Sequence, residues 1–151
     1  MNTMNSKKTS SNIGLYIHWP FCLSKCPYCD FNSHVVASVD HSRWENALVS
    51  ELTFLSRNQN HKKLKSIFFG GGTPSLMKPE TVFKAIQTAK KIWDVKQPIE
   101  ITLEANPSSI ECQTFNSFKQ AGINRVSLGV QAFDDKALSF LGRSHDRLDA
   151  I

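Results

Sequence analysis

Three cysteines on one short stretch are the residues of this chain best suited to chemistry. Cys22, Cys26 and Cys29 lie within LYIHWPFCLSKCPYCDFNS, residues 15–33, with the spacing C-x3-C-x2-C. Thiolates on a short loop can hold zinc or an iron–sulfur cluster, and closed sites of either kind take four ligands. Three cysteines leave one position open. An open iron of a cluster can bind a small molecule and pass it an electron.

Two other interpretations of these cysteines stay open from their spacing alone. His34 could supply a fourth ligand and close a zinc site, or two cysteines could form a redox pair beside a spare thiol. Short metal-binding motifs do produce false matches. A fourth cysteine, Cys112, lies near the face formed by Phe115 and Phe118, so a buried, inert thiol is predicted there.

Composition describes an ordinary globular chain. It has 151 residues, 40% hydrophobic and 21% charged, which fits one soluble domain. The net charge is +5, but the basic residues are scattered, and the densest run is Lys62, Lys63 and Lys65. A solvated surface is therefore favoured over a nucleic-acid interface, and an anionic ligand is also compatible.

The first residues carry no recognisable targeting signal. MNTMNSKKTSSN has neither the apolar core of a signal peptide nor an Arg-rich amphipathic pattern. No apolar run reaches the length of a transmembrane helix. Cysteines without such a signal indicate a reducing compartment and metal binding rather than disulfides. We expect a cytoplasmic protein with a disordered tail over residues 1–13 and one core domain over residues 14–151.

Strands and helices are predicted to alternate along the core domain. Strands are predicted over residues 15–19, 65–69, 99–104 and 125–130. The first helix is predicted over residues 41–57, with Trp44, Leu48, Leu52 and Leu55 on one face, and the second from Pro79, with an apolar stripe of Val82, Ile86, Ala89 and Trp93. The third is predicted from a Ser108–Glu111 capping box to Gly122, and the fourth from about Asp134. This order with long connections predicts a parallel sheet with right-handed crossovers.

The first, third and fourth strands alternate apolar and polar side chains. Their apolar faces can meet the helices and their polar faces can line an open lumen, as a partial (βα) barrel requires. A Rossmann-type sheet is the competing architecture, but no G-x-G-x-x-G follows the first strand. In both folds the ligand binds at the carboxyl ends of the strands. The fold class predicted is therefore α/β, a partial (βα) barrel.

Several polar groups stand at those strand ends. Gly70–Pro74 follows the second strand, and such a turn can approach a ligand closely or merely reverse the chain. Its sequence is not that of a nucleoside-triphosphate loop. Glu104 ends the third strand and could either bind a polar ligand or pair with Arg125. Gln131, predicted to face the lumen at the end of the fourth strand, and Arg143 beyond it would by themselves be interpreted as surface residues.

The motifs taken together resemble one enzyme superfamily. YIHWPFC…CPYCDFNS, the glycine turn, Glu104, Gln131 and the LGRSHD segment resemble the radical S-adenosylmethionine (SAM) enzymes, specifically the oxygen-independent coproporphyrinogen III oxidase-like family. The resemblance runs from about Gly14 to the last residue. It implies a [4Fe-4S] cluster whose fourth iron is chelated by SAM, and reductive cleavage of SAM to a 5′-deoxyadenosyl radical. Because such barrels have six strands and four are predicted, we expect an N-terminal fragment with an incomplete barrel.

The resemblance also implies roles for individual residues. Cys22, Cys26 and Cys29 correspond to the cluster ligands, and no further catalytic residue is assigned. The residues that correspond to SAM contacts are Tyr16, Tyr28, Gly71, Gly72, Thr73, Glu104, Gln131 and Arg143, the last two for a second SAM molecule. Tyr28 could instead pack under the cysteine loop. His18 is expected to be a hydrogen-bonded structural imidazole rather than a ligand.

Two branches of this family remain as alternatives. The oxidase decarboxylates coproporphyrinogen III and carries a fourth cysteine two residues after the third, where this chain has Phe31. It also has a longer segment before the first strand. Both differences favour the heme chaperone type, which binds heme or a porphyrin and delivers heme to acceptor proteins such as respiratory enzymes. Whether the chain is itself an enzyme stays open, and a zinc-binding structural module is the third hypothesis.

Overall fold

The computed structural model describes residues 11–59, 61–107 and 109–151, without the side chains of residues 109–113. The strands are β1 Asn12–Trp19, β2 Phe21–Cys22, β3 His34–Val35, β4 Lys63–Gly71, β5 Glu100–Ala105 and β6 Arg125–Leu128. The helices are α1 His41–Ser56, α2 Pro79–Ile92, α3 Ser109–Ala121 and α4 Asp135–Phe140, with short 3-10 turns at Pro74–Leu76 and Leu148–Ala150.

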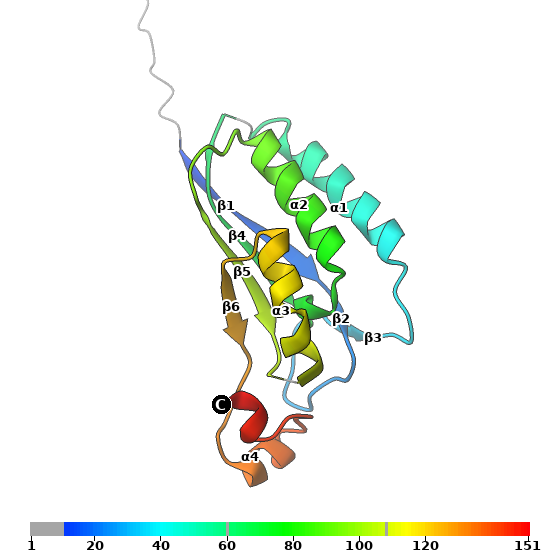
Figure 1. Cartoon of the computed structure of the whole chain (residues 1–151). Helices are drawn as coiled ribbons and strands as arrows, with labels where there is room; N and C mark the ends of the chain where they lie inside the picture. Colours follow the sequence, from blue (N-terminus) through cyan, green and yellow to red (C-terminus); the bar gives the residue numbers. More distant parts are fainter. Residues whose placement is uncertain (1–10, 60, 108) are drawn as a thin grey trace, which may run out of the picture.

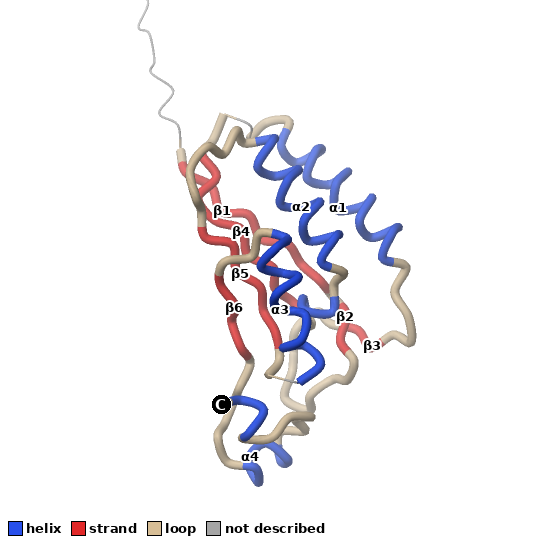
Figure 2. Tube along the Cα trace, viewed as in Figure 1, coloured by secondary structure: helices blue, strands red, loops and turns tan. Residues whose placement is uncertain are grey.

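Four strands form one parallel sheet in the order β1-β4-β5-β6, and β2 pairs with β3 in a separate parallel pair. Helices α1, α2 and α3 cover one face of the sheet (Figures 1 and 2). The strands point toward the end of the molecule that carries α4. This arrangement confirms the α/β class and the four parallel strands predicted from the alternation of elements.

The core fills the space between the sheet and these three helices. The predicted stripe of α2 is buried throughout: Val82, Ile86 and Ala89 are fully buried, and Trp93 is 7% exposed. The sheet contributes the apolar sides of its strands, which are Ile17, Trp19, Ile67, Phe69, Ile101 and Leu103. Burying side chains of this size stabilises a fold by roughly 1.5–3 kcal/mol each. The predicted apolar faces of the first and third strands are therefore confirmed.

Helix boundaries follow local signals that the sequence contains. α2 begins at Pro79, a favoured first-turn residue, as predicted. α3 ends at Ala121, and Gly122 adopts a φ of +109°, a conformation that favours glycine. The carboxylate of Asp134 accepts a hydrogen bond of 2.8 Å from the backbone N–H of Ala137, which caps α4 where its start was predicted.

Two predicted apolar faces are partly wrong. Leu55 is 54% exposed, because the core side of α1 is centred on Leu52 and Ser56, and Leu55 lies at its border in the last turn. Val126 and Leu128 are 37% and 43% exposed. Their strand, β6, lies at the edge of the sheet, and α4 sits beyond the strand ends rather than against it (Figure 1). β6 also ends two residues earlier than predicted.

Some predictions fall outside the described residues. They are the capping box at Ser108 and Glu111, the Cys112 thiol, and residues 1–10 of the predicted tail. β1 already begins at Asn12, inside the segment predicted as tail. Within the described part of the chain, no helix is long and apolar enough to span a membrane.

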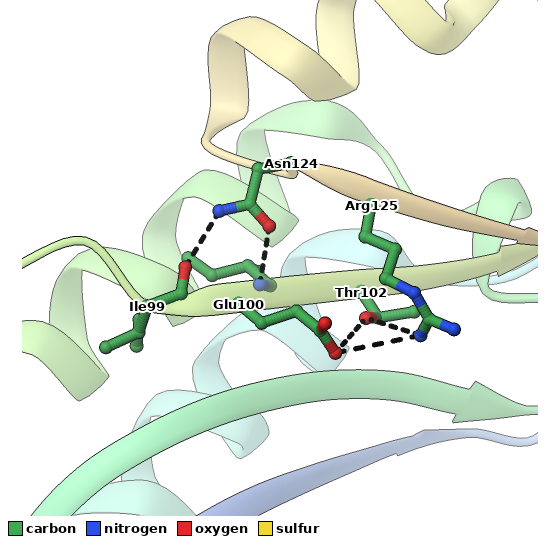
Figure 3. Close-up of polar contacts among 6 residues, drawn as sticks. Ile99, Glu100, Thr102, Asn124 and Arg125 are labelled. Carbon is green, nitrogen blue, oxygen red and sulfur yellow. Dashed lines mark hydrogen bonds and ion pairs between the residues drawn. The ribbon is translucent and has the colours of Figure 1, made fainter.

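Asn124 joins β5 to the turn that precedes β6 (Figure 3). Its Oδ1 accepts a hydrogen bond of 2.8 Å from the N–H of Ile101, and its Nδ2 donates one of 2.7 Å to the carbonyl of Ile99. Its own N–H donates to the carbonyl of Ile101 at 3.1 Å. One side chain therefore satisfies both backbone groups at the start of β5 and fixes where β6 begins.

We predict that Asn124→Ala lowers the free energy of unfolding by about 1–2 kcal/mol, since two hydrogen bonds to backbone are lost and water replaces them only in part. Urea denaturation followed by circular dichroism measures this change. Asn46→Ala, an exposed substitution on α1, is the matched control and should stay within about 0.5 kcal/mol of the wild type. Equal stabilities for the two variants would contradict the role given to Asn124.

Candidate functional site

The cysteine loop is closed at its base by two short strands that the sequence did not predict. β2 and β3 pair through Phe21 with His34 and Cys22 with Val35, and the N–H of His34 also donates to the carbonyl of Pro20 at 2.6 Å. Inside the loop the N–H of Cys29 donates to the carbonyl of Cys26 at 3.0 Å. The three cysteines are free thiols and half-buried.

The glycine turn after β4 lies directly against the start of this loop. The N–H of Gly72 donates to the carbonyl of Trp19 at 2.7 Å, and that of Thr73 to the carbonyl of Phe21 at 2.9 Å. The Thr73 hydroxyl donates to Cys22 Sγ at 3.4 Å. A Cβ on Gly72 would lie 2.8 Å from the carbonyl oxygen of Phe21 and 2.9 Å from Cys22 Sγ, so only glycine fits without movement.

Gly71 is also restricted to glycine, by its backbone conformation and by the ring of His18. Its φ is +120°, and a Cβ there would lie 2.7 Å from the ring of His18. Its N–H donates to Glu104 Oε2 at 3.2 Å. Glu104 is thereby held at the carboxyl end of β5, with its carboxylate turned toward the glycine turn.

Glu104 does not pair with Arg125, which was the alternative role for its charge. Arg125 lies 3.6 Å from the carboxylate of Glu100 and donates to the hydroxyl of Thr102 at 3.2 Å (Figure 3). The strand register explains this choice, because Arg125 lies opposite Thr102 while Glu104 lies opposite Ser127. The carboxylate of Glu104 therefore lies among the groups at the carboxyl ends of the strands.

Arg143 reaches the cysteine loop from the turn after α4. Its Nη1 donates to Cys26 Sγ at 3.4 Å and to the hydroxyl of Tyr28 at 3.5 Å. Its Nη2 donates to Asn106 Oδ1 at 2.5 Å and to the carbonyl of Gly129 at 2.8 Å. A guanidinium has five N–H groups, so these contacts leave only that of Nε, which is buried without a partner. Binding a carboxylate through two N–H groups would displace one of these contacts.

These groups surround one cavity of about 350 Å³. This size is within the range of small-molecule sites. The residues predicted to act at the site that line the cavity are Cys22, Cys26, Cys29, Tyr28, Gly71, Gly72, Thr73, Glu104, Gln131 and Arg143. Gln131 has a φ of +66°, which turns the chain at the cavity edge just after β6. Sequence elements more than a hundred residues apart thus meet at the carboxyl ends of the strands.

Tyr16 is the predicted site residue that does not line this cavity. Its ring stacks on Phe68, and its hydroxyl lies 3.2 Å from His18 Nδ1. His18 Nε2 lies 2.9 Å from the carbonyl of Asn32, which must accept, so Nε2 carries the proton and Nδ1 accepts from Tyr16. His18 is therefore a hydrogen-bonded imidazole that ties β1 to the cysteine loop, as predicted.

The hydroxyl groups of Tyr16 and Tyr28 both have a raised pKa. Burial, and secondarily the charge of Glu104, raises the pKa of Tyr16 above its ordinary value. Burial also raises the pKa of Tyr28, helped by a hydrogen bond with Cys26 and opposed by the charge of Arg143. Both hydroxyls are thus neutral hydrogen-bonding groups near pH 7.

The three thiols are the donors of this site that could hold a cluster. Within the described part of the chain, no three His, Cys, Asp or Glu side chains are placed to hold one ion. His34 is exposed on β3. The three thiols border one cavity, and two of them accept hydrogen bonds from Thr73 and Arg143. These residues fit a multi-iron cluster held by three cysteines.

Sequence reasoning missed several polar residues of the cavity wall, among them Asn106 and Ser33. Asn106, which was noted only as part of a strand-breaking Asn-Pro pair, binds the guanidinium of Arg143. Ser33 lines the cavity with a buried hydroxyl. The position of Asn106 just after β5 could have indicated it, since side chains there share the edge that carries Glu104. Ser33 carries no such signal.

Comparison with known proteins agrees with this geometry. A family model described as the radical SAM superfamily matches residues 16–151. The chain belongs to the radical SAM superfamily. The resemblance inferred from the cysteine spacing and the strand-end motifs is confirmed at this level.

Several radical SAM relatives are similar over most of this chain. It is 43% identical over 145 residues to the heme chaperone HemW of Haemophilus influenzae, covering 91% of this chain and 37% of that protein. It is 40% identical over 142 residues to the mitochondrial radical S-adenosyl methionine domain-containing protein 1 of Bos taurus, covering 94% of this chain and 32% of that protein. The chain thus spans about a third of the length of these curated relatives.

A solved structure confirms the radical SAM fold. The coproporphyrinogen III oxidase HemN of Escherichia coli superposes with a TM-score of 0.82 at 24% identity, covering 93% of this chain and 33% of that one. At this identity the likeness shows the fold. The four-stranded sheet described above corresponds to part of that radical SAM fold.

We predict that Gly72→Ala lowers both the stability of the chain and its iron content after reconstitution. The new methyl group would collide with backbone at Phe21 and with Cys22 Sγ, and overpacking of this kind costs about 1–3 kcal/mol. Urea denaturation and iron analysis measure the two effects.

Gly129→Ala is the matched control for this substitution. Gly129 lines the same cavity, but a Cβ there would make only ordinary contacts of 3.5–3.6 Å. We expect its stability to stay within about 0.5 kcal/mol of the wild type. If both variants kept full iron content, the close approach at Gly72 would not be what places Cys22.

Proposed function

We propose that the chain forms the N-terminal part of the radical SAM domain of a heme chaperone, with a [4Fe-4S] cluster on Cys22, Cys26 and Cys29 and SAM as its second cofactor. The observation that carries this proposal is that three free thiols, the glycine turn and Arg143 line the same cavity. Superfamily membership supports the same pair of cofactors.

The residues of the cavity suit this pair of cofactors. The three thiols would ligate three irons, and hydrogen bonds from Thr73 to Cys22 and from Arg143 to Cys26 would orient two of these ligands. Such a cluster, when bound and reduced, supplies one electron for cleavage of SAM. The β2–β3 pair closes the base of the loop that carries the three thiols.

The SAM site would lie at the carboxyl ends of β4, β5 and β6. Gly71, Gly72 and Thr73 present backbone close to the thiols, which suits the amino-acid end of SAM, and Glu104 would accept from its amino or ribose groups. Gln131 and Arg143 also line the cavity and would serve a second SAM molecule, with Tyr28 as an aromatic contact. Tyr16 is proposed as a SAM contact from the family resemblance alone, because it lies outside the lining of this cavity.

Two observations favour a chaperone over the oxidase. A relative named heme chaperone HemW is 43% identical, whereas the structure of coproporphyrinogen III oxidase is 24% identical. Phe31 stands where the oxidase family has a fourth cysteine; it is 61% exposed and lines the cavity. We therefore propose heme as cargo and heme-accepting proteins, such as respiratory enzymes, as partners. An oxidase that decarboxylates coproporphyrinogen III is the second candidate.

We also propose a cytoplasmic location for the protein. Cytoplasmic location stays a prediction from the sequence, and the Bos taurus relative is named as mitochondrial. The half-buried free thiols are compatible with any reducing compartment.

We predict that the reconstituted chain binds hemin, seen as a shift of the Soret absorption band, and leaves coproporphyrinogen III unchanged when SAM and a reductant are added. Both assays use anaerobic protein, with chromatographic separation of porphyrinogen products. Bovine serum albumin and the chain without cluster are the controls for unspecific hemin binding. Formation of a decarboxylated porphyrinogen would contradict the chaperone assignment and favour the oxidase.

A further inference from the structure

Ser33 is a buried polar residue whose hydroxyl has no partner. Its side chain is 6% exposed, and its Oγ makes no hydrogen bond. It lines the same cavity as Cys22, Cys29 and Gly72. Leaving a buried hydroxyl unpaired costs about 1–3 kcal/mol, so such a group in a cavity wall indicates an acceptor that arrives with the ligand.

The backbone on both sides of Ser33 is fixed. The carbonyl of Asn32 lies 2.9 Å from His18 Nε2, and the N–H of His34 donates to the carbonyl of Pro20 at 2.6 Å. His34 also belongs to the β2–β3 pair at the base of the cysteine loop. The hydroxyl therefore cannot turn to solvent by a local backbone movement without breaking these contacts.

Two other side chains of this wall donate hydrogen bonds to cysteine sulfur. The Thr73 hydroxyl donates to Cys22 Sγ, and Arg143 Nη1 donates to Cys26 Sγ, each at 3.4 Å. Arg143 Nε is a second buried donor without a partner. This wall therefore contains two donors that already bind thiols, on Thr73 and Arg143, and two buried donors without a partner, Ser33 Oγ and Arg143 Nε. Such a wall suits a ligand that is rich in acceptor atoms, such as the sulfides and thiolates of a cluster.

We propose that Ser33 contacts the cofactor directly and that its hydroxyl donates a hydrogen bond to a sulfur of the iron–sulfur cluster. This inference rests on the proposed function, which places the cluster in this cavity. Hydrogen bonds to cluster sulfurs stabilise the more negative, reduced state and raise the reduction potential. Ser33 therefore helps to set the potential at which the cluster accepts its electron.

The test compares Ser33→Ala with the wild type by redox titration of the reconstituted chain without SAM, followed by electron paramagnetic resonance. Ser33→Ala should shift the midpoint potential to a more negative value. Ser24→Ala is the matched control, because Ser24 lines the same cavity from the same loop but is exposed, and it should leave the potential unchanged.

A second measurement separates this role from a structural one. In the chain without cluster, the hydroxyl of Ser33 has no partner, so Ser33→Ala should leave the free energy of unfolding unchanged or raise it. A clear loss of stability in that form would overturn the inference, because it would show that the hydroxyl already serves the fold.

Two further results would overturn the inference. If Ser33→Ala keeps its cluster and its potential but weakens SAM binding, then the acceptor is SAM and not a cluster sulfur. If the wild-type chain binds no cluster, then the proposed function fails as well. That failure is recognised from the iron content of the wild type, before any variant is compared.

Discussion

The contact between the glycine turn after β4 and the start of the cysteine loop is the constraint on which the rest of the site depends. Gly72 donates to the carbonyl of Trp19 at 2.7 Å, and no space remains for a side chain between this turn and Cys22. Because β1 and β4 are paired in parallel up to Trp19 and Gly71, the sheet delivers the two segments together. The position of the first thiol is thus fixed by the register of the sheet.

The second thiol, that of Cys26, is contacted from the opposite end of the chain. Arg143, from the turn after α4, connects Cys26 and Tyr28 with Asn106 after β5 and Gly129 after β6. The cavity is therefore lined on the one hand by the cysteine loop and the glycine turn, and on the other by the ends of β5 and β6 and the turn after α4. A charged side chain shared among four partners couples the cysteine loop to the strand ends opposite it.

Much of this arrangement could be predicted from residues alone. Alternating apolar positions located β1 and β5, the stripe from Val82 to Trp93 located the buried face of α2, and the glycine turn and Glu104 marked the strand-end site. These features depend on local periodicity and on the rule that parallel strands end together.

The parts that could not be predicted depend on tertiary contacts. The exposure of Val126 and Leu128 depends on where α4 lies, and the pairing of Arg125 with Glu100 depends on strand register. The β2–β3 pair has only two residues in each strand, too few for a period to be visible. The unpaired hydroxyl of Ser33 became apparent only when the cavity around it was known.

The measurement that tests the central claim most directly is metal analysis after anaerobic reconstitution with iron and sulfide, applied to the wild type, Cys26→Ser and His34→Ala. The account predicts the iron and sulfide content of a [4Fe-4S] cluster in the wild type and in His34→Ala, and its loss in Cys26→Ser. Zinc in place of iron, lost on substitution of His34, would contradict the account at its foundation.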